Sequence, residues 1–408
     1  MRYIAVTVIL VVFIQVNCIS QTKAINDTTR FFKVFGIDNH QKAVRFYSIK
    51  NGQTFYIKKN AGNNLHYLMR DSIAVDSVEG QIFEYNFTPE QSVILASGDS
   101  KSKIYYEINL ADSNIEQLYD IDQELLGKYK DTYIVGQHQK AKYIDEMSYI
   151  SKVAVYSPLT KGIVKEINLR DHLAESEGVI QVLVFEKKGL VLFITALCYA
   201  DGCENYKYIL YSFDDNKLLK AVNSAVTNPS RIIPGTSGDN FFITQEHDYK
   251  NLYVSNVNLD TYDTVLNRNI NVIGKALWDE NKVAYFFESK LDSKKHSWQA
   301  KEERVIISAK VDLSLEKTIS KIYHNQRLEV NVFSEFSLYD LLLLKNMIFA
   351  KHNYAFDNPY YQAYFNLFSF YNTDEMRKAR TKNVNNKLSE ADKANLAEIK
   401  KVLKSLND

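Results

Sequence analysis

A repeating strand–turn–strand pattern occupies residues 25–325 and limits the folds that this part of the chain can adopt. An alternating apolar stretch, a short polar turn and a second such stretch recur at intervals of roughly fifty residues. Four clear copies start with the stretches Ile104–Leu110, Val153–Tyr156, Tyr208–Phe213 and Leu252–Leu259. Val305–Leu313, continuing to Ile319, predicts one further copy, and Phe46–Ile49 with the turn Lys50-Asn51-Gly52 is expected to open the series.

Several short strands per period, repeated about six times, are typical of a β-propeller, whose blades hold four strands each. Radial repetition leaves only short sheet edges unpaired, whereas one open sheet of this length would expose long edges. We therefore expect a mainly β protein, with a β-propeller-like body over residues 25–325 followed by an α C-terminal module. Six blades are favoured, with seven as the alternative count, and a sandwich or two stacked sheets is the alternative architecture.

Composition supports a sheet-rich fold and excludes one class of partner. The chain has 28 Tyr and 22 Phe but only 14 Gly, and aromatic rings fit the pleated, half-buried surface of a sheet. Its 50 Lys and Arg nearly cancel its 49 Asp and Glu, leaving a formal net charge of +1. This balance offers no electrostatic attraction to a polyanion, so we expect no nucleic-acid partner.

Residues 1–20 have the features of a signal peptide. Arg2 supplies a positive charge, and Ile4–Ile14 is an apolar run of the length that an export signal needs. Small residues at Cys18 and Ser20 favour cleavage after Ser20, and no run reaches the roughly 20 apolar residues of a transmembrane helix. We expect export to the periplasm, the cell surface or the medium. A lipid anchor at Cys18 is the alternative to a soluble product.

The other two cysteines, Cys198 and Cys203, enclose an Asp201-Gly202 turn between two apolar alternating stretches. Asp-Gly between such stretches indicates a hairpin, which would place the two thiols nearly opposite each other. In an oxidising compartment this arrangement favours a disulfide, with a reduced pair as the alternative. No His lies close by, so we expect no metal site at this pair.

Residues 330–408 change to helical periodicity. Apolar residues at three-and-four spacing predict a helix over about Ser337–His352, and Asn353 suits the left-handed position that follows it. Pro359 predicts the start of a short second helix that runs to Phe365. Ser389–Asp392 predicts a capping box at the start of the last helix, with the shorter Asp at its acidic position.

The segment Lys345–Phe356 resembles the signature of the YARHG domain, and later residues follow that family in order and spacing. These residues are Tyr364, Phe365, Phe370, Tyr371, Leu388, Asp392, Lys393, Ala394, Asn395 and Ile399. The pentad of the family is changed here to Phe349-Ala350-Lys351-His352-Asn353. The resemblance implies a bacterial, presumed extracellular domain with an interaction role, and it implies no reaction. Lys in place of Arg loses the planar fork that binds carboxylate or phosphate groups in a bidentate manner.

Four residues of this module are the candidate binding residues: Lys351, His352, Tyr371 and Asn395. Each also has a structural interpretation. The imidazole of His352 could bond the last carbonyls of its helix or interact with the helix dipole. The Asn395 amide could tie the last helix to the turn after His352, because a mid-helix amide usually satisfies a neighbouring backbone group.

No known catalytic motif occurs in the chain. The sequence has no His-Glu-x-x-His segment, no Gly-x-Ser-x-Gly elbow and no phosphate-binding loop, so we expect no catalytic residue, metal or cofactor. The leading hypothesis is a non-enzymatic, exported binding or scaffold protein of the bacterial cell envelope, which engages a protein or a glycan. The alternative is a propeller enzyme, a hydrolase or lyase, that acts on a glycan or peptide in a central pocket.

Overall fold

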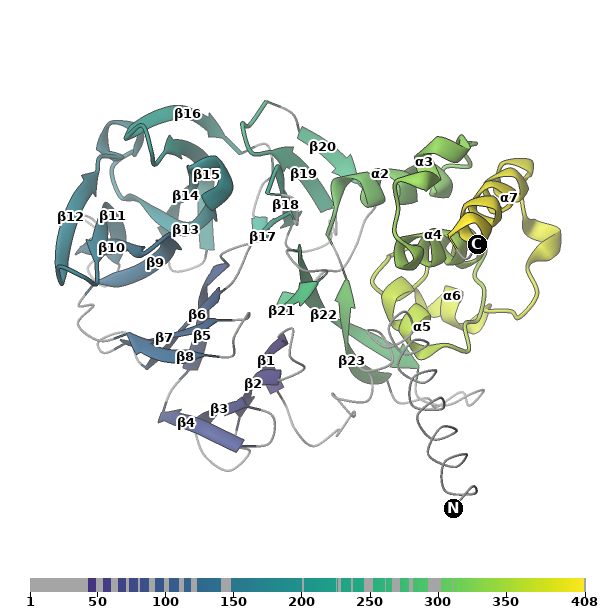
Figure 1. Cartoon of the computed structure of the whole chain (residues 1–408), viewed down its shortest axis with the longest axis horizontal. Coiled ribbons are helices and arrows are strands. Elements are labelled where there is room, and N and C mark those ends of the chain that lie inside the picture. The colour runs from purple at the N-terminus through teal and green to yellow at the C-terminus, as the bar shows by residue number, and fades with distance from the viewer. Residues whose placement is uncertain are drawn as a thin grey trace, which may run out of the picture.

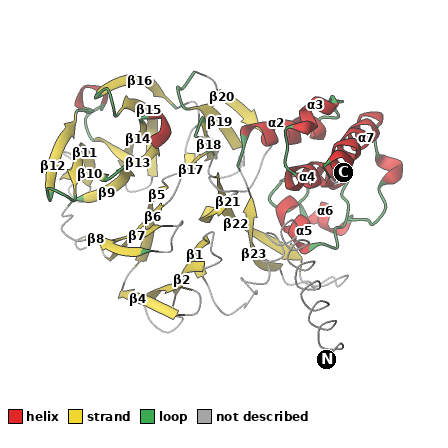
Figure 2. Ribbon diagram, viewed as in Figure 1, coloured by secondary structure: helices red, strands yellow, loops and turns green. Residues whose placement is uncertain are grey.

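A computed structural model of the chain describes residues 43–48, 54–59, 65–70, 73–79, 81–87, 92–98, 103–109, 114–118, 123–140, 148–199, 202–224, 226, 229–235, 238–245, 252–260, 262–265, 272–278, 282–292, 302–309 and 311–406. The predicted signal peptide over residues 1–20, with its cleavage position after Ser20 and the alternative anchor at Cys18, lies outside these residues. In the described part, strands dominate up to residue 309 and helices follow from residue 313 (Figure 2).

The described strands form six consecutive antiparallel units. The first three are β1–β4 (Ala43–Ser48, Thr54–Lys59, Leu65–Arg70, Ile73–Glu79), β5–β8 (Gln81–Phe87, Ser92–Gly98, Lys103–Asn109, Ile115–Leu118) and β9–β12 (Glu124–Tyr129, Thr132–Lys140, Ser148–Ser157, Gly162–Ile167). The others are β13–β16 (Glu177–Phe185, Leu190–Tyr199, Gly202–Ser212, Lys217–Asn223), β17–β20 (Pro229–Pro234, Asn240–Gln245, Leu252–Asn256, Tyr262–Val265) and β21–β23 (Val272–Trp278, Lys282–Asp292, Glu302–Ala309).

The first and last of these units are joined. β1 pairs with β21 in parallel, with Phe46 opposite Gly274 and Ser48 opposite Ala276. In Figure 1 the six units follow one another around a common centre. The body is therefore propeller-like, as the repeat predicted. Radial repetition leaves only short sheet edges unpaired.

Apolar cores lie between neighbouring units, because each sheet buries both faces. Successive residues of a strand point to opposite faces, so β13 places Val182 and Val184 in a cluster with β9–β12. The alternate residues Leu183 and Phe185 join a second cluster, shared with β17 and β18. This double burial explains why β13 and β14 are almost continuously apolar in sequence.

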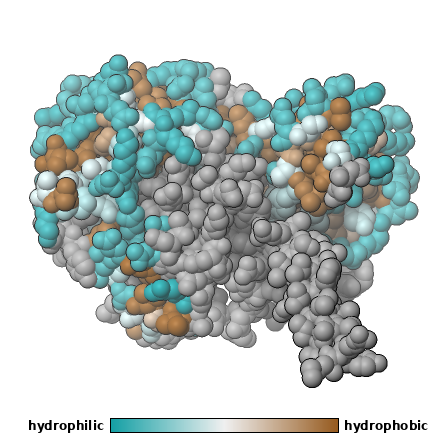
Figure 3. All heavy atoms as spheres, in the orientation of Figure 1, coloured by the Kyte–Doolittle hydropathy of each residue, from teal (hydrophilic) through white to brown (hydrophobic). Residues whose placement is uncertain are grey.

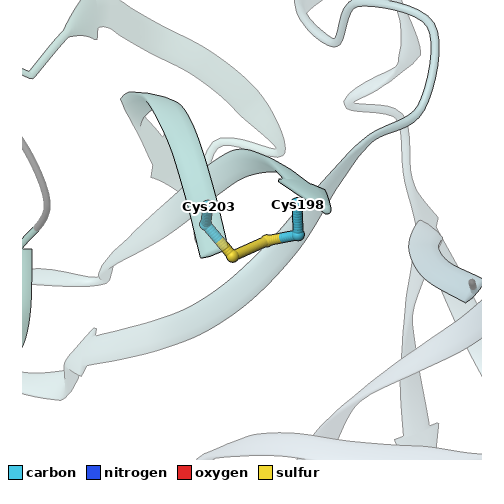
Figure 4. The surroundings of a disulfide bond; sticks show 2 residues. All are labelled: Cys198 and Cys203. Carbon is cyan, nitrogen blue, oxygen red and sulfur yellow. A yellow bond between two sulfur atoms is a disulfide. The ribbon is translucent and has the colours of Figure 1, made fainter. Parts of the chain in front are cut away.

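Cys198 and Cys203 form the predicted disulfide at the tip of the β14–β15 hairpin (Figure 4). The two residues are direct cross-strand partners, next to the pair Tyr199 and Gly202. Gly202 has φ +149°, a conformation that a side chain would strain. The pairing of Tyr199 with Gly202 confirms the predicted hairpin.

Replacing both cysteines by serine is expected to lower the free energy of unfolding by about 2 kcal/mol, the value for a short closed loop. The disulfide joins residues five positions apart, so it restricts only a small part of the unfolded chain. Urea unfolding of the double variant beside the oxidised wild type measures this difference. Equal stability of the two proteins would contradict the expectation.

Six α-helices and one 3-10 turn make up the C-terminal part of the described chain. They are α2 (Leu313–Tyr323), α3 (Val330–Ser334), α4 (Leu338–Ala350), α5 (Pro359–Phe365), α6 (Asp374–Lys378), η3 (Asn385–Lys387) and α7 (Glu390–Ser405). Their apolar cluster also contains Ile233, Phe242 and Val254, from β17, β18 and β19. The helices therefore share a core with the fifth unit of the body, and Figure 1 shows them on that side of the ring.

Local signals placed three of these helices correctly. The Ser337 hydroxyl caps α4 by accepting a hydrogen bond from the Asp340 N–H, and Pro359 begins α5. Ser389 and Asp392 form the predicted capping box of α7. Asn353 has the expected left-handed backbone, with φ +65°.

The predicted strand that continued from Leu313 to Ile319 is wrong, because this segment is the helix α2. The Asp312 carboxylate accepts hydrogen bonds from the backbone N–H groups of Ser314 and Leu315, which starts a helix. Leu315, Ile319 and Ile322 then fall on one buried face at helical spacing. α2 packs with the helices, although it lies within the range predicted for the β body.

Candidate functional site

A groove of about 1360 Å³ lies over β10–β12 and the segment that leads into β13. Its volume exceeds the roughly 300–1,000 Å³ of ordinary small-molecule pockets. In Figure 3 the visible face over β9–β16 is mostly hydrophilic, with scattered hydrophobic residues. A hollow of this size suits a part of a polymer better than one small molecule.

Paired side chains of β10 and β11 form the floor of the groove. Gln137 lies opposite Lys152, and Gln139 lies opposite Tyr149. Ser151 has no partner of its own between these pairs, because the register shifts between Gln137 and His138. Such a bulge changes the direction of neighbouring side chains and is common beside binding sites.

One wall of the groove is held in place by a buried carboxylate. Glu177, only 3% exposed, accepts hydrogen bonds from Thr195 Oγ1 (2.5 Å), Lys207 Nζ (2.9 Å) and the Ala174 N–H (2.8 Å). Lys207 Nζ also donates to the His172 carbonyl (2.7 Å). Thr195 and Lys207 are cross-strand partners in the middle of the disulfide-bonded hairpin. The hairpin therefore supports the wall through Glu177.

Many polar side chains in the groove make no hydrogen bond or ion pair with the rest of the protein, as far as the described residues show. These side chains are Gln123, Gln137, Gln139, Tyr149, Ser151, Lys152, Glu166 and Arg170. Five of them, Gln137, Gln139, Lys152, Glu166 and Arg170, are exposed, so water can bond to them. Among the described residues none occupies these groups, and a ligand could replace that water.

His138 also lines the groove, and its Nε2 contacts the Glu124 carboxylate. His138 is half-exposed, while the side chain of Glu124 is 11% exposed. A carboxylate that orients a histidine is the arrangement used for general acid–base catalysis. This pair is the one feature of the groove that suits a reaction.

The predicted binding residues lie elsewhere, in the helical part. Lys351 is 4% exposed, and its ammonium group donates to Ile322 O (2.7 Å) and Asn325 Oδ1 (2.9 Å). Its third contact is an ion pair with Asp392 Oδ1 (2.5 Å), so the ammonium group is held by protein groups on three sides.

His352 contacts the same carboxylate, through Nε2 and Asp392 Oδ2 (2.8 Å). The expected bond from its ring to the last helix carbonyls is therefore replaced by a contact with α7. Asp392 is fully buried and also accepts from the Ser389 N–H (3.0 Å). We call Lys351, His352 and Asp392 the clasp, because they join the end of α4 to the start of α7.

Burial raises the pKa of the Asp392 carboxyl, but hydrogen bonds from Lys351, His352 and Ser389 outweigh it and hold this pKa below its ordinary 3.8. A carboxylate whose pKa is lower in the folded state than in the unfolded state stabilises the fold when the pH is above the unfolded-state pKa. This contribution is lost as the pH falls through the folded-state pKa.

The free energy of unfolding is therefore expected to fall as the pH drops below about 4, with Asp392 as one cause. Asp392→Asn, which has no proton to take up, should lose less stability over the same range. Urea unfolding of both proteins between about pH 6 and pH 2 measures the two slopes. Parallel slopes would show that Asp392 does not contribute.

Asn395 and Tyr371 are also used inside the protein. The Asn395 side chain accepts from the Leu328 N–H (2.9 Å) and donates to Gln326 O (2.9 Å). It therefore joins α7 to the segment before α3, and the predicted link to the turn after His352 is wrong. Tyr371 is fully buried, and its hydroxyl donates to Tyr354 O (2.6 Å).

The structure brings Lys351 and His352 together on Asp392, and it places none of the four candidate residues in the groove. Sequence reasoning missed the groove itself. The sequence feature that could have indicated the groove is the polar run Gln137-His138-Gln139. It lies near the end of β10, after the apolar residues Tyr133–Val135.

In the part of the chain that the structure describes, no group of three or more His, Cys, Asp or Glu side chains is arranged to hold a metal ion. None of the described helices is long and apolar enough to cross a membrane.

Three comparisons with known proteins add to this description. The model of the YARHG domain family matches residues 316–404. A search of curated protein sequences finds no match. Among solved structures, TolB from Acinetobacter baumannii is similar at 10% identity and a TM-score of 0.36, over 54% of this chain and 53% of TolB. The chain thus spans about half the length of that protein.

The family match begins inside α2 and ends inside α7, so it contains the clasp, Tyr371 and Asn395. YARHG domains are of an extracellular type, which fits an envelope-associated protein. Residues 316–404 are a YARHG domain, which this chain carries after a propeller-like β body.

Proposed function

We propose that this protein is exported to the bacterial cell envelope, where it binds a protein or a glycan without catalysing a reaction. The groove over β10–β12 is the binding site in this proposal. The YARHG domain contributes the stability of its own helices and docks on the fifth unit of the body. In its clasp, the Lys351 side chain is only 4% exposed and contacts three protein groups, so it offers little surface to a ligand.

One observation carries the proposal: the groove concentrates polar side chains that have no partner among the described residues. Two of them, Lys152 and Arg170, are exposed cations, and the three glutamines can each donate and accept hydrogen bonds. A ligand that displaces water from such groups is oriented and selected by them. The groups therefore serve binding rather than the stability of the fold.

Arg170→Ala is expected to weaken binding of the full chain to washed bacterial envelopes by about tenfold, through loss of a charged hydrogen-bond donor. Arg327→Ala is the matched control, because Arg327 is also exposed, has no ion pair with another described residue and lies outside the groove. Co-sedimentation over a range of protein concentrations gives both affinities. An unchanged affinity of Arg170→Ala would remove the groove from the proposal.

The second candidate function is a hydrolase or lyase, and the His138–Glu124 pair is the observation that favours it. His138 would act as the general base or acid, held in position by Glu124. Product release from the same envelopes, which His138→Gln abolishes while binding persists, would support the enzyme and overturn the non-enzymatic proposal.

A further inference from the structure

We infer that the Cys198–Cys203 disulfide is a redox-sensitive control on the groove, because its reduction loosens the wall over residues 170–177. The wall leads into β13 and carries Arg170. The effect on binding rests on the proposed function, whereas the coupling between the disulfide and the wall is independent of it.

The disulfide lies in a part of the β14–β15 hairpin that extends beyond its sheet (Figure 4). Pairing of β14 with β13 ends at Leu197, which lies opposite Glu177. On the other side, β16 and the residue after it bond no further along β15 than Tyr206. No third strand pairs with the hairpin tip in the described part of the chain. A two-stranded hairpin alone is marginally stable in water, so the order of this tip depends on its covalent link.

A reductant can reach the disulfide. Cys198 and Cys203 are only half-buried, and their neighbours Tyr199, Gly202 and Glu204 are exposed. The chain has three cysteines, so no second intramolecular disulfide can form beside this one. Thiol–disulfide exchange requires such access to the sulfur atoms.

A dithiol reduces the bond in two exchange steps. One of its thiolates attacks a sulfur of the disulfide, forms a mixed disulfide and releases the other cysteine as a thiolate. The second thiolate of the reagent then breaks the mixed disulfide. The reagent becomes a cyclic disulfide, and the protein, having gained two electrons and two protons, holds two thiols.

The hairpin holds the wall a few residues away from this bond. Thr195 Oγ1 (2.5 Å) and Lys207 Nζ (2.9 Å) both donate to the Glu177 carboxylate. Lys207 Nζ also donates to the His172 carbonyl (2.7 Å), and Glu177 accepts from the Ala174 N–H (2.8 Å). Two points of the wall therefore depend on one cross-strand pair of the hairpin.

A register shift separates that pair from the disulfide. After Thr195 and Lys207, the next described pair on the Leu197 side is Leu197 with Glu204, directly beside the disulfide. Within the shift Asn205 has left-handed backbone, with φ +54°, which Asn tolerates at some cost. A disrupted ladder resists local opening poorly. Once the tip is released, opening is therefore expected to reach the pair that holds Glu177.

The test is amide hydrogen exchange of the full chain, followed by mass spectrometry, with and without dithiothreitol. Reduction is expected to speed exchange at least about tenfold in peptides that cover residues 170–177 and 195–207. Helix α7 is the internal control and should exchange at the same rate in both states. Cys198→Ser combined with Cys203→Ser should exchange fast without the reductant and show no further response to it.

Co-sedimentation with washed envelopes provides the second measurement. The reduced wild type is expected to bind about tenfold more weakly than the oxidised wild type, and reoxidation should restore the affinity. Unchanged exchange in the wall after reduction overturns the inference and leaves the proposed function intact. Faster exchange with unchanged binding, in an assay where Arg170→Ala weakens binding, overturns the control of the groove by the disulfide. If Arg170→Ala binds as the wild type does, the proposed function fails, and the exchange rates still decide the coupling.

Discussion

Asp392→Ala is expected to destabilise the YARHG domain by about 3–5 kcal/mol, because it leaves the buried Lys351 ammonium without its counter-charge. Asp392 is fully buried and Lys351 is 4% exposed, so little water can replace the missing carboxylate. The contact to His352 and the capping bond to the Ser389 N–H are lost in the same variant. Thermal and urea unfolding measure the effect.

Asp374→Ala is the matched control for this variant. Asp374 also lies in the first turn of a helix and pairs with a cation, Arg377, but its side chain is 80% exposed. Exposed ion pairs contribute about 0–1 kcal/mol, so the control should stay close to the wild type. If the two variants were equally stable, the clasp would have no special role.

A double variant separates the ion pair from the packing. Lys351→Met with Asp392→Leu removes both charges and keeps apolar volume, a change that is often neutral when a buried pair is replaced. It should be more stable than Asp392→Ala, although Ile322 O and Asn325 lose their bonds from Lys351. A double-mutant cycle then gives the coupling energy between the two residues.

Elements that depend on local signals could be predicted from the sequence. Pro359 and Ser389 each act within one helical turn, so their roles follow from residue type and spacing. The repeated strand pairs and the Asp201-Gly202 turn are local as well. The propeller-like body followed from the repeat, and the pairing of β1 with β21 joins its first and last units.

Contacts between distant segments could not be predicted in this way. The Lys351–Asp392 pair joins residues about forty positions apart, and Asn395 bonds to a segment 67–69 positions away. Many polar residues compete for each such partner, and only the packed fold decides between them. The α2 error has a different cause: one side chain, Asp312, turns an alternating segment into a helix.

Predicting the groove requires both local signals and contacts between distant segments. Gln137-His138-Gln139 marks a polar strand end, but its partners Lys152 and Tyr149 are set by the register of β10 and β11. The shift at Ser151 changes which side chains share that face. Pairing register and bulge position have no unique signature in one sequence, so the site was visible only in the structure.

Glu177→Ala is expected to cost about 3 kcal/mol of folding stability, the low end for breaking a buried ion pair. The low end applies because the Lys207 side chain remains 22% exposed and water can reach it. Without Glu177, the Thr195 hydroxyl and the Ala174 N–H also lose their acceptor. Urea unfolding beside Glu204→Ala, an exposed glutamate on the same hairpin, measures the difference.

The same variant should also weaken envelope binding, although Glu177 has no free oxygen for a ligand. Its carboxylate holds the wall that carries Arg170, so the wall is expected to lose its position when Glu177 is removed. Glu177→Gln keeps the shape and part of the hydrogen bonding, and it should bind with intermediate affinity. If Glu177→Ala folds stably and binds envelopes as tightly as Glu204→Ala, then the wall needs no support from the disulfide-bonded hairpin.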